Sequence, residues 1–161
     1  MLNALDHKTL MAPENQKSFL ELRIIWKDDD MFELKVTASN INFFGTTEVY
    51  DQSDSILRFA SSLTGFPKDN KTLFHEAGER DSYAYFSMKY YPICRSGVVG
   101  VEIELESNVA TEFRQEEKNK LKLEIIVEPS AIDNFRKELV ELAKTEEGSA
   151  RLYGNDNRID C

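Results

Sequence analysis

A single stretch, residues 82–106, constrains the fold of this chain more than any other. Its side chains alternate with period two on both sides of a tight turn at Arg95-Ser96-Gly97. Such alternation is typical of two β-strands joined as a hairpin, because successive side chains of a strand point to opposite faces of a sheet. The sequence therefore predicts a β-hairpin whose first strand is rich in tyrosine and whose second strand alternates aliphatic residues with glutamate.

Other segments repeat this alternation. Residues 19–26, 32–38, 40–50 and 121–127 are predicted as strands, and residues 73–75 as a short one. In the third of these, Gly45 interrupts the pattern and indicates a β-bulge. In the first, one face is shared by Leu20, Leu22, Ile24 and Trp26.

Two segments change to the 3.6-residue period of an amphipathic helix. The first covers residues 51–65, with Asp51 as its predicted N-cap and Gly65 with Pro67 as its stop. The second begins at Ser130, has Asp133 in its first turn and is predicted to end at Gly148. The two apolar stripes are Ile56, Phe59, Ala60 and Leu63, and Ile132, Phe135, Leu139, Leu142 and Ala143.

The element order predicts an α+β fold with two layers. Short links favour antiparallel neighbours, because a parallel crossover needs a dozen or more residues. We therefore expect a mainly antiparallel sheet of about six strands, with two amphipathic helices covering one face. Residues 19–148 are predicted to form a single α+β domain, preceded by a flexible N-terminal arm at 1–18. Residues 149–161 are predicted as a C-terminal tail, frayed or docked only by Leu152 and Tyr153.

Charge and length limit the function classes. The 161-residue chain carries 29 acidic and 20 basic residues, a formal net charge of −9 at pH 7. A nucleic-acid-binding surface needs basic residues to replace phosphate counterions, so this balance argues against such a partner. It favours a basic protein partner, which the charge would attract. The sequence shows neither a stretch of about 20 apolar residues nor a secretory signal, so we expect no membrane association and a cytoplasmic location.

The chain holds no complete catalytic or metal-binding motif. His75-Glu76-Ala77-Gly78-Glu79 begins like a zinc-protease helix but lacks the second histidine one turn on. Arg95 would favour a thiolate at Cys94, yet no nucleophile motif surrounds this cysteine, and we expect a small, partly buried apolar role for it. Asp28-Asp29-Asp30 lacks the spaced ligands of a calcium loop and indicates a solvated turn. We therefore expect a non-enzymatic protein without metal or cofactor.

Three glutamates of the predicted hairpin are candidate contact residues. Period two projects Glu102, Glu104 and Glu106 from one sheet face about 7 Å apart. Such carboxylates serve either as a protein-binding surface, as a pair for glycoside chemistry, or only as solvated partners of Lys120 and Lys122. The sequence leaves these alternatives open.

Three tyrosines complete the candidate surface. Tyr83, Tyr85 and Tyr91 share a face of the preceding strand. Aromatic side chains on a sheet stack on bases in several RNA-binding modules, but the acidic balance opposes that use. Core packing or a protein contact fits better, since tyrosine is enriched at the centres of interfaces. If the hairpin pairs in register, the tyrosines and glutamates lie on the same face.

The order of elements is similar to that of small bacterial domains found among the immunity proteins of polymorphic toxin systems and their uncharacterised relatives. The resemblance rests on residues 56–67, 83–91, 98–105, 121–128 and 132–142. In those domains a helix that closes on a hydrophobic-Pro step, here Phe66-Pro67, precedes an aromatic strand, two apolar strands and a final helix. The resemblance implies a non-enzymatic protein that binds and blocks one toxin, and it transfers no site residue, because the contact surfaces vary.

The leading prediction is a non-catalytic, acidic protein-binding module whose carboxylate and tyrosine surface occludes a basic active-site cleft. An immunity protein is its most specific form. The alternatives are a small-ligand-binding domain with a pocket between sheet and helices, and an assembly subunit that oligomerises through an exposed face. An enzyme using Cys94 or the glutamates is a further alternative. The sequence does not indicate an oligomeric state.

Overall fold

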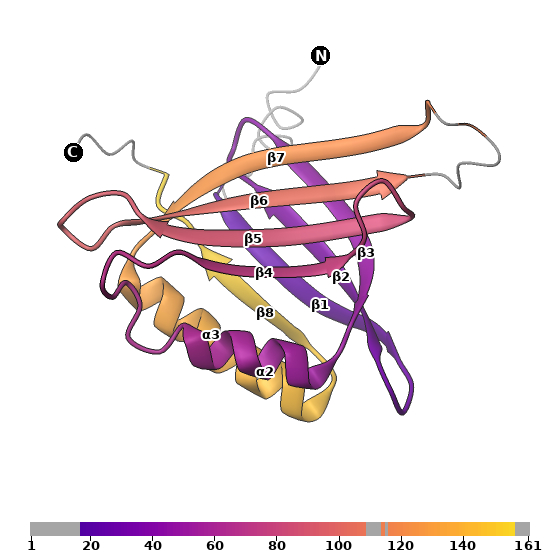
Figure 1. Ribbon diagram of the computed structural model, residues 1–161, viewed down its shortest axis with the longest axis horizontal. Helices are drawn as coiled ribbons and strands as arrows, with labels where there is room; N and C mark the ends of the chain where they lie inside the picture. Colours follow the sequence, from indigo (N-terminus) through magenta and orange to yellow (C-terminus); the bar gives the residue numbers. More distant parts are fainter. Residues whose placement is uncertain (1–16, 109–113, 115, 157–161) are drawn as a thin grey trace, which may run out of the picture.

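The computed structural model describes residues 17–108, 114 and 116–156, so most of the predicted arm and the last five residues of the predicted tail lie outside it. The described residues form eight strands and two helices (Figure 1). The strands are β1 (Phe19–Lys27), β2 (Phe32–Ser39), β3 (Phe44–Asp51), β4 (Leu73–Gly78), β5 (Ala84–Pro92), β6 (Val99–Asn108), β7 (Lys118–Val127) and β8 (Ser149–Tyr153), and the helices are α2 (Ser53–Ser62) and α3 (Pro129–Thr145).

The strands form two four-stranded sheets, and the prediction of one sheet of about six strands is wrong. Sheet A has the order β3-β2-β1-β8, and sheet B has the order β4-β5-β6-β7. All pairs within the sheets are antiparallel, which confirms the expectation from the short links. Period two identifies strands but not their neighbours. Here α2 separates β3 from β4, and the chain starts a new sheet after it.

The two sheets and both helices enclose one apolar core. In Figure 1, sheet B runs across the view, β1 to β3 run obliquely behind it, and α2 and α3 lie together at one end. The predicted α+β class and both helical stripes are confirmed, since every stripe residue is buried. The sheets contribute, among others, Leu20, Leu22, Leu34, Val36, Phe86, Met88, Val101, Ile103, Leu123 and Ile125.

The segment predicted as a tail contributes a strand. β8 pairs with β1 in register, with Leu152 opposite Leu20 and Ala150 opposite Leu22. Ala150 and Leu152 are both fully buried. Five residues with only two apolar side chains give too short a pattern for a strand prediction, and the pairing depends on a partner about 130 positions away in the chain.

A bulge is present in sheet A, but it is not at Gly45. The β2–β3 register runs without a break, with Gly45 opposite Ala38. A side chain at Gly45 would place its Cβ 2.5 Å from Leu121 Cδ2, so glycine here makes room for the core. The register shifts instead in β1, between Ile24 and Trp26.

The helix ends also differ from the prediction. Gln52, not Asp51, precedes the first turn of α2, and no side chain caps it. Asp51 is instead the last residue of β3 and is buried. α3 begins at Pro129, whose missing N–H is no loss in a first turn, and its last residue, Thr145, is followed by Glu146 in the left-handed conformation, not by the predicted stop at Gly148. No helix among the described residues is both long enough and apolar enough to cross a membrane.

Because β8 pairs with β1 and buries Leu152, we expect Leu152 to contribute to stability as a core residue. Leu152→Ala removes a fully buried side chain and should lower the free energy of unfolding by about 2–4 kcal/mol, measured by urea denaturation. Ser149→Ala, at an exposed position of the same strand, should change it by less than about 0.5 kcal/mol. Equal, small effects of the two substitutions would contradict the docking of β8.

Candidate functional site

The candidate tyrosines and glutamates meet on the outer face of sheet B. In the β5–β6 register Tyr85 lies opposite Glu106, and Tyr91 lies opposite Gly100, two residues before Glu102. Cross-strand partners share a face, so the expectation for an in-register hairpin is confirmed for Tyr85 and Tyr91. Tyr83 precedes β5 and is 70% exposed.

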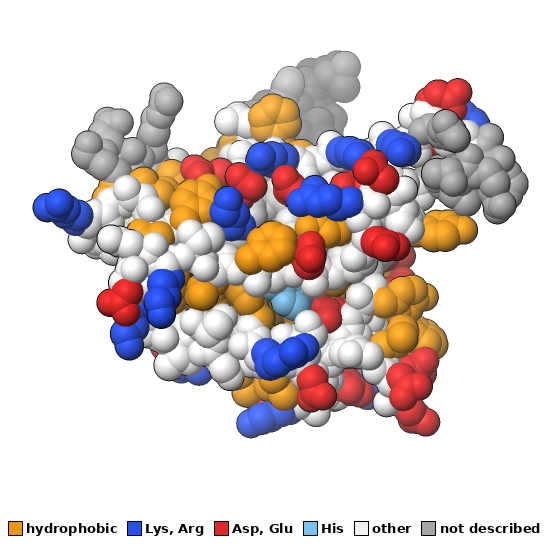
Figure 2. All heavy atoms as spheres, in the orientation of Figure 1, with side chains coloured by type: hydrophobic (Ala, Val, Ile, Leu, Met, Phe, Trp, Pro, Cys, Tyr) orange, Lys and Arg blue, Asp and Glu red, His pale blue; other side chains and the backbone are white. Residues whose placement is uncertain are grey.

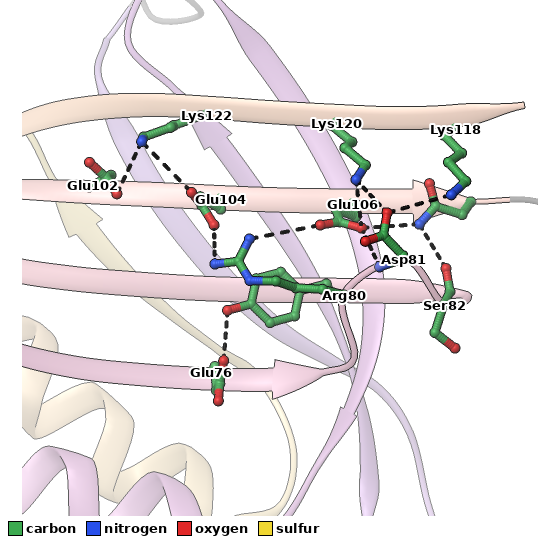
Figure 3. A network of polar contacts seen from close by, with 12 residues as sticks. Glu76, Arg80, Asp81, Ser82, Glu102, Glu104, Glu106, Lys118, Lys120 and Lys122 are labelled. Carbon is green, nitrogen blue, oxygen red and sulfur yellow. Dashed lines mark hydrogen bonds and ion pairs between the residues drawn. The ribbon is translucent and has the colours of Figure 1, made fainter. Parts of the chain in front are cut away.

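Cations already contact the three glutamates. Arg80 comes from the turn between β4 and β5, and its Nη2 lies 2.5 Å from Glu104 Oε2 (Figure 3). Its Nη1 lies 4.0 Å from Glu106 Oε2. Lys122, on β7, lies 3.7 Å from Glu102 and 3.9 Å from Glu104. We call this outer face of sheet B the network face; its charged members are Arg80, Asp81, Glu102, Glu104, Glu106, Lys118, Lys120 and Lys122.

The network face is anchored by a buried carboxylate. Glu106 is only 4% exposed. Its Oε1 accepts hydrogen bonds from the Asp81 N–H at 2.9 Å and from Asn108 Nδ2 at 3.2 Å. Lys120 Nζ lies 3.8 Å from the same oxygen. Glu106 therefore fixes the β4–β5 turn and is not available to a partner in this conformation.

Tyr85 and Tyr91 are also held by groups within the sheet. The Tyr85 hydroxyl donates to Glu76 at 2.7 Å, and the Arg80 guanidinium lies 4.3 Å from the Tyr85 ring centre. Tyr85 is 1% exposed, and its burial raises the pKa of its hydroxyl. The Tyr91 hydroxyl donates to Glu124, and burial followed by this hydrogen bond raises the pKa of Tyr91. Of the predicted tyrosine contacts, Tyr83 is exposed, Tyr91 is partly buried and Tyr85 is buried.

Trp26 lies on the outer face of sheet A. The alternation of β1 predicts that it shares a face with Leu20, Leu22 and Ile24, and the sequence did not decide whether Trp26 is a core or a surface residue. The bulge leaves Ile25 without a cross-strand partner and pairs Trp26 with Glu33. A one-residue insertion reverses the direction of every side chain after it. Trp26 is consequently 49% exposed.

Tyr50 supports Trp26 from β3. The two rings meet edge to face, with their centres 6.1 Å apart. Glu33 lies between them in the register, opposite both Trp26 and Tyr50. A hydrogen bond to Glu33 raises the pKa of Tyr50, and the charges of Glu33 and Asp28 act in the same direction. The β1–β2 turn and this aromatic pair therefore lie within reach of one another.

The carboxylates of the β1–β2 turn differ from those of the network face in their lack of ion pairs within the described residues. No Lys or Arg within the described ranges forms an ion pair with Asp28, Asp29 or Asp30. Asp28 Oδ1 accepts hydrogen bonds from the Met31 and Asp30 N–H groups, which lower the pKa of Asp28. The predicted solvated turn is thus a compact, exposed group of carboxylates.

A buried polar pair joins β3 to β4. His75 Nε2 lies 2.9 Å from Asp51 Oδ2, and both side chains are at most 6% exposed. The His75 ring packs against Phe59 of α2, with the ring centres 5.2 Å apart. Figure 2 shows histidine at the bottom of a hollow on this side of the molecule. The sequence marked His75 only as a failed zinc motif and assigned Asp51 to a helix cap, so the pair was missed.

Other candidate chemistry is sparse in the part of the chain that the structure describes. Cys94 is disulfide-bonded, which the sequence analysis did not anticipate, so its sulfur is not a free thiolate here. Within the described ranges, no group of three or more His, Cys, Asp or Glu side chains is placed to hold a metal ion. Surface depressions of about 370–650 Å³ are lined mainly by polar residues. One depression of about 650 Å³ is lined by Lys17, Glu128, Ala131, Tyr153, Gly154, Asn155 and Asp156.

No protein-family model matches this chain, and neither a curated protein nor a solved structure shows significant similarity to it. The resemblance to immunity proteins therefore stays a prediction that rests on the order and composition of the elements.

The buried pair gives a stability prediction. Asp51→Ala leaves His75 without its partner in a buried position and should lower the free energy of unfolding by at least about 2 kcal/mol. Glu48→Ala, at an exposed position of the same strand, should cost less than about 1 kcal/mol. A double-mutant cycle with His75→Ala should show coupling, and additive effects would contradict a direct interaction.

The network face gives an electrostatic prediction. A hydrogen bond from Lys120 at 2.6 Å, with the charges of Lys120 and Lys118, lowers the pKa of Asp81. Lys120→Met should therefore raise the pKa of Asp81 toward the ordinary value of an aspartate. NMR titration of the side-chain carboxyl carbon measures this, with Lys122→Met as the control, because Lys122 pairs with other carboxylates. An unchanged Asp81 pKa in Lys120→Met would contradict the network.

Proposed function

We propose that this chain is a non-catalytic protein-binding module that occludes a basic surface of a partner protein, with an immunity protein that blocks a toxin as its most specific form. One observation carries the proposal. The outer face of sheet A is open to solvent and exposes four aromatic side chains by 49–66%. These are Trp26 and Tyr50, whose rings contact each other near the β1–β2 turn, and Phe44 and Tyr153, which lie at the other end of the sheet on its two edge strands.

Aromatic side chains on an open sheet face suit protein contacts. Monomeric proteins rarely leave large apolar side chains grouped on the surface, and such groups mark interaction sites. Tryptophan and tyrosine are also the residues enriched at the centres of protein interfaces, because each buries a large, rigid surface on binding. The described residues offer no comparable grouping for catalysis, so binding is the better supported class.

Charge supports a basic partner. The chain carries a net charge of −9, which accelerates association with a basic surface and disfavours acidic competitors. The mechanism is occlusion, in which the bound module covers the partner's cationic cleft and neutralises it. No step of this mechanism requires a reaction at the module itself.

The network face is the second candidate contact surface. Its carboxylates are paired within the sheet, and exposed ion pairs of this kind contribute only about 0–1 kcal/mol each, so a partner's cations can replace the lysines. Glu102, whose side chain is 29% exposed, and Tyr83 are the members open enough to touch a partner. Glu106 and Tyr85 would act by holding the turn in place.

Recovery and inhibition of one partner test the proposed function. The tagged chain, incubated with native lysate at low salt, should retain one basic protein in a 1:1 ratio and release it at high salt. The purified partner should then lose its activity when one equivalent of the chain is added. Recovery of the bait alone, or of a partner whose affinity is independent of salt, would contradict binding by charge complementarity.

Variants of the network face test the surface of glutamates and tyrosines that the sequence predicts. If this face contacts the partner, Glu102→Lys with Tyr83→Ala should weaken binding at least tenfold in calorimetry. These positions are chosen because substitution of Glu106 or Tyr85 would disturb the fold. Glu141→Lys, an equal charge change at an exposed position of α3, is the control. Equal affinities of the two variants would remove the network face as the contact.

A further inference from the structure

We propose that Trp26, Tyr50 and the acidic β1–β2 turn form the contact site for an arginine-bearing basic segment of the partner, an inference that rests on the proposed protein-binding function. We call this group the Trp26 site. Its members are Trp26, Asp28, Asp29, Asp30, Glu33 and Tyr50.

The first step of the argument is the direction of Trp26. Without the bulge, the alternation of β1 would place Trp26 on the same face as Leu20, Leu22 and Ile24. The inserted Ile25 turns it outward instead and is itself 42% exposed. Bulges recur where a strand must re-aim a side chain for function. The bulge thus presents the single tryptophan of the chain on the outer face of sheet A.

The second step is the rigidity of the aromatic pair. Trp26 and Tyr50 contact edge to face, and Glu33 lies opposite both of them in the strand register. Both rings are set on paired strands rather than on a loop. A site that is held in place before binding loses less conformational entropy when a partner docks.

The third step is the charge around the rings. The segment 27–35 holds four carboxylates and two lysines, and the three turn aspartates have no cation partner in the described part of the chain. Figure 2 shows hydrophobic and acidic side chains together at the lower right, the end at which Figure 1 places the β1–β2 turn. This unpaired charge contrasts with the network face, where lysines and an arginine already neutralise the carboxylates.

Arginine is the side chain that can contact both the aromatic rings and the unpaired carboxylates. Its planar guanidinium stacks on aromatic rings and presents a fork of donors to carboxylates, whereas the compact ammonium of lysine does only part of this. A second copy of this chain fits less well, because two acidic turns would repel one another. A nucleic acid is disfavoured for the same reason.

The test uses Trp26 itself as the reporter, since it is the single tryptophan of the chain. The full-length protein is titrated with a hexa-arginine peptide at low salt while tryptophan emission is followed. We expect a saturable change in emission that weakens as salt is added. Hexa-lysine should bind at least threefold more weakly, and hexa-glutamate should produce no change.

Two variants locate the site. Asp28→Asn with Asp29→Asn and Asp30→Asn should weaken hexa-arginine binding at least tenfold. The control removes three exposed carboxylates from other loops, Asp69→Asn, Glu79→Gln and Glu128→Gln, and gives the same net charge. Trp26→Ala, followed by calorimetry, should also weaken binding at least tenfold, with far-UV circular dichroism confirming that the variant is folded.

The outcomes separate this inference from the proposed function. Unchanged Trp26 emission with hexa-arginine, or equal affinities of the two triple variants, would overturn the Trp26 site while binding through another surface stands. A partner recovered from lysate that binds Trp26→Ala as tightly as the unmodified chain would overturn it as well. A dimer that Trp26→Ala converts to a monomer in sedimentation would assign the patch to a second copy and also reject the inference. Absence of any protein partner would count against the proposed function itself.

Discussion

The architecture depends on one constraint: two antiparallel sheets must bury their inward-facing rows of side chains in a single core. Each strand gives every second residue to that core, and both helical stripes close it at one end. The outward-facing rows are then the part of the sheets that remains for function. On sheet B this outward row is closed by a network of ion pairs around Glu106, whereas on sheet A Glu21 pairs with Arg23 and Arg151, and Trp26 and Tyr50 stay exposed.

Local periodicity predicted what each segment is, but not how the segments assemble. The apolar stripes of α2 and α3 were found because a helix brings residues three and four apart to one face without reference to the rest of the chain. The division into two sheets was not found, because the choice of neighbours is decided by packing between segments. β8 was missed for the same reason, since its pairing with β1 joins opposite ends of the domain.

The same distinction holds for the candidate site: contacts that strand register sets were predictable, and contacts that depend on a turn or a bulge were not. Tyr85, Tyr91 and the glutamates share a face because of the strand register, and the sequence predicts this if the hairpin pairs in register. The closing of this face by Arg80 was not foreseeable, because Arg80 lies in a turn whose path period two does not describe. Trp26 shows the limit most clearly. One extra residue in β1 reverses its direction, and no feature of the sequence near Ile25 marks where the extra residue is placed.

Under the proposed binding function, the position of unpaired charge, rather than the net charge, defines where a partner should dock. Carboxylates that already contact lysine or arginine add little to the field felt at a distance, because each pair is nearly neutral beyond a few ångströms. Within residues 17–108, 114 and 116–156 the three turn aspartates have no ion-pair partner, and Asp28 acts on Tyr50 of the exposed aromatic pair, so long-range attraction and short-range contact coincide at this turn. A surface built in this way attracts a cation from solution and then holds it by contact with the rings. The open end of sheet A therefore satisfies both requirements of a rapid and specific protein contact, whereas the network face satisfies neither until its own pairs are broken.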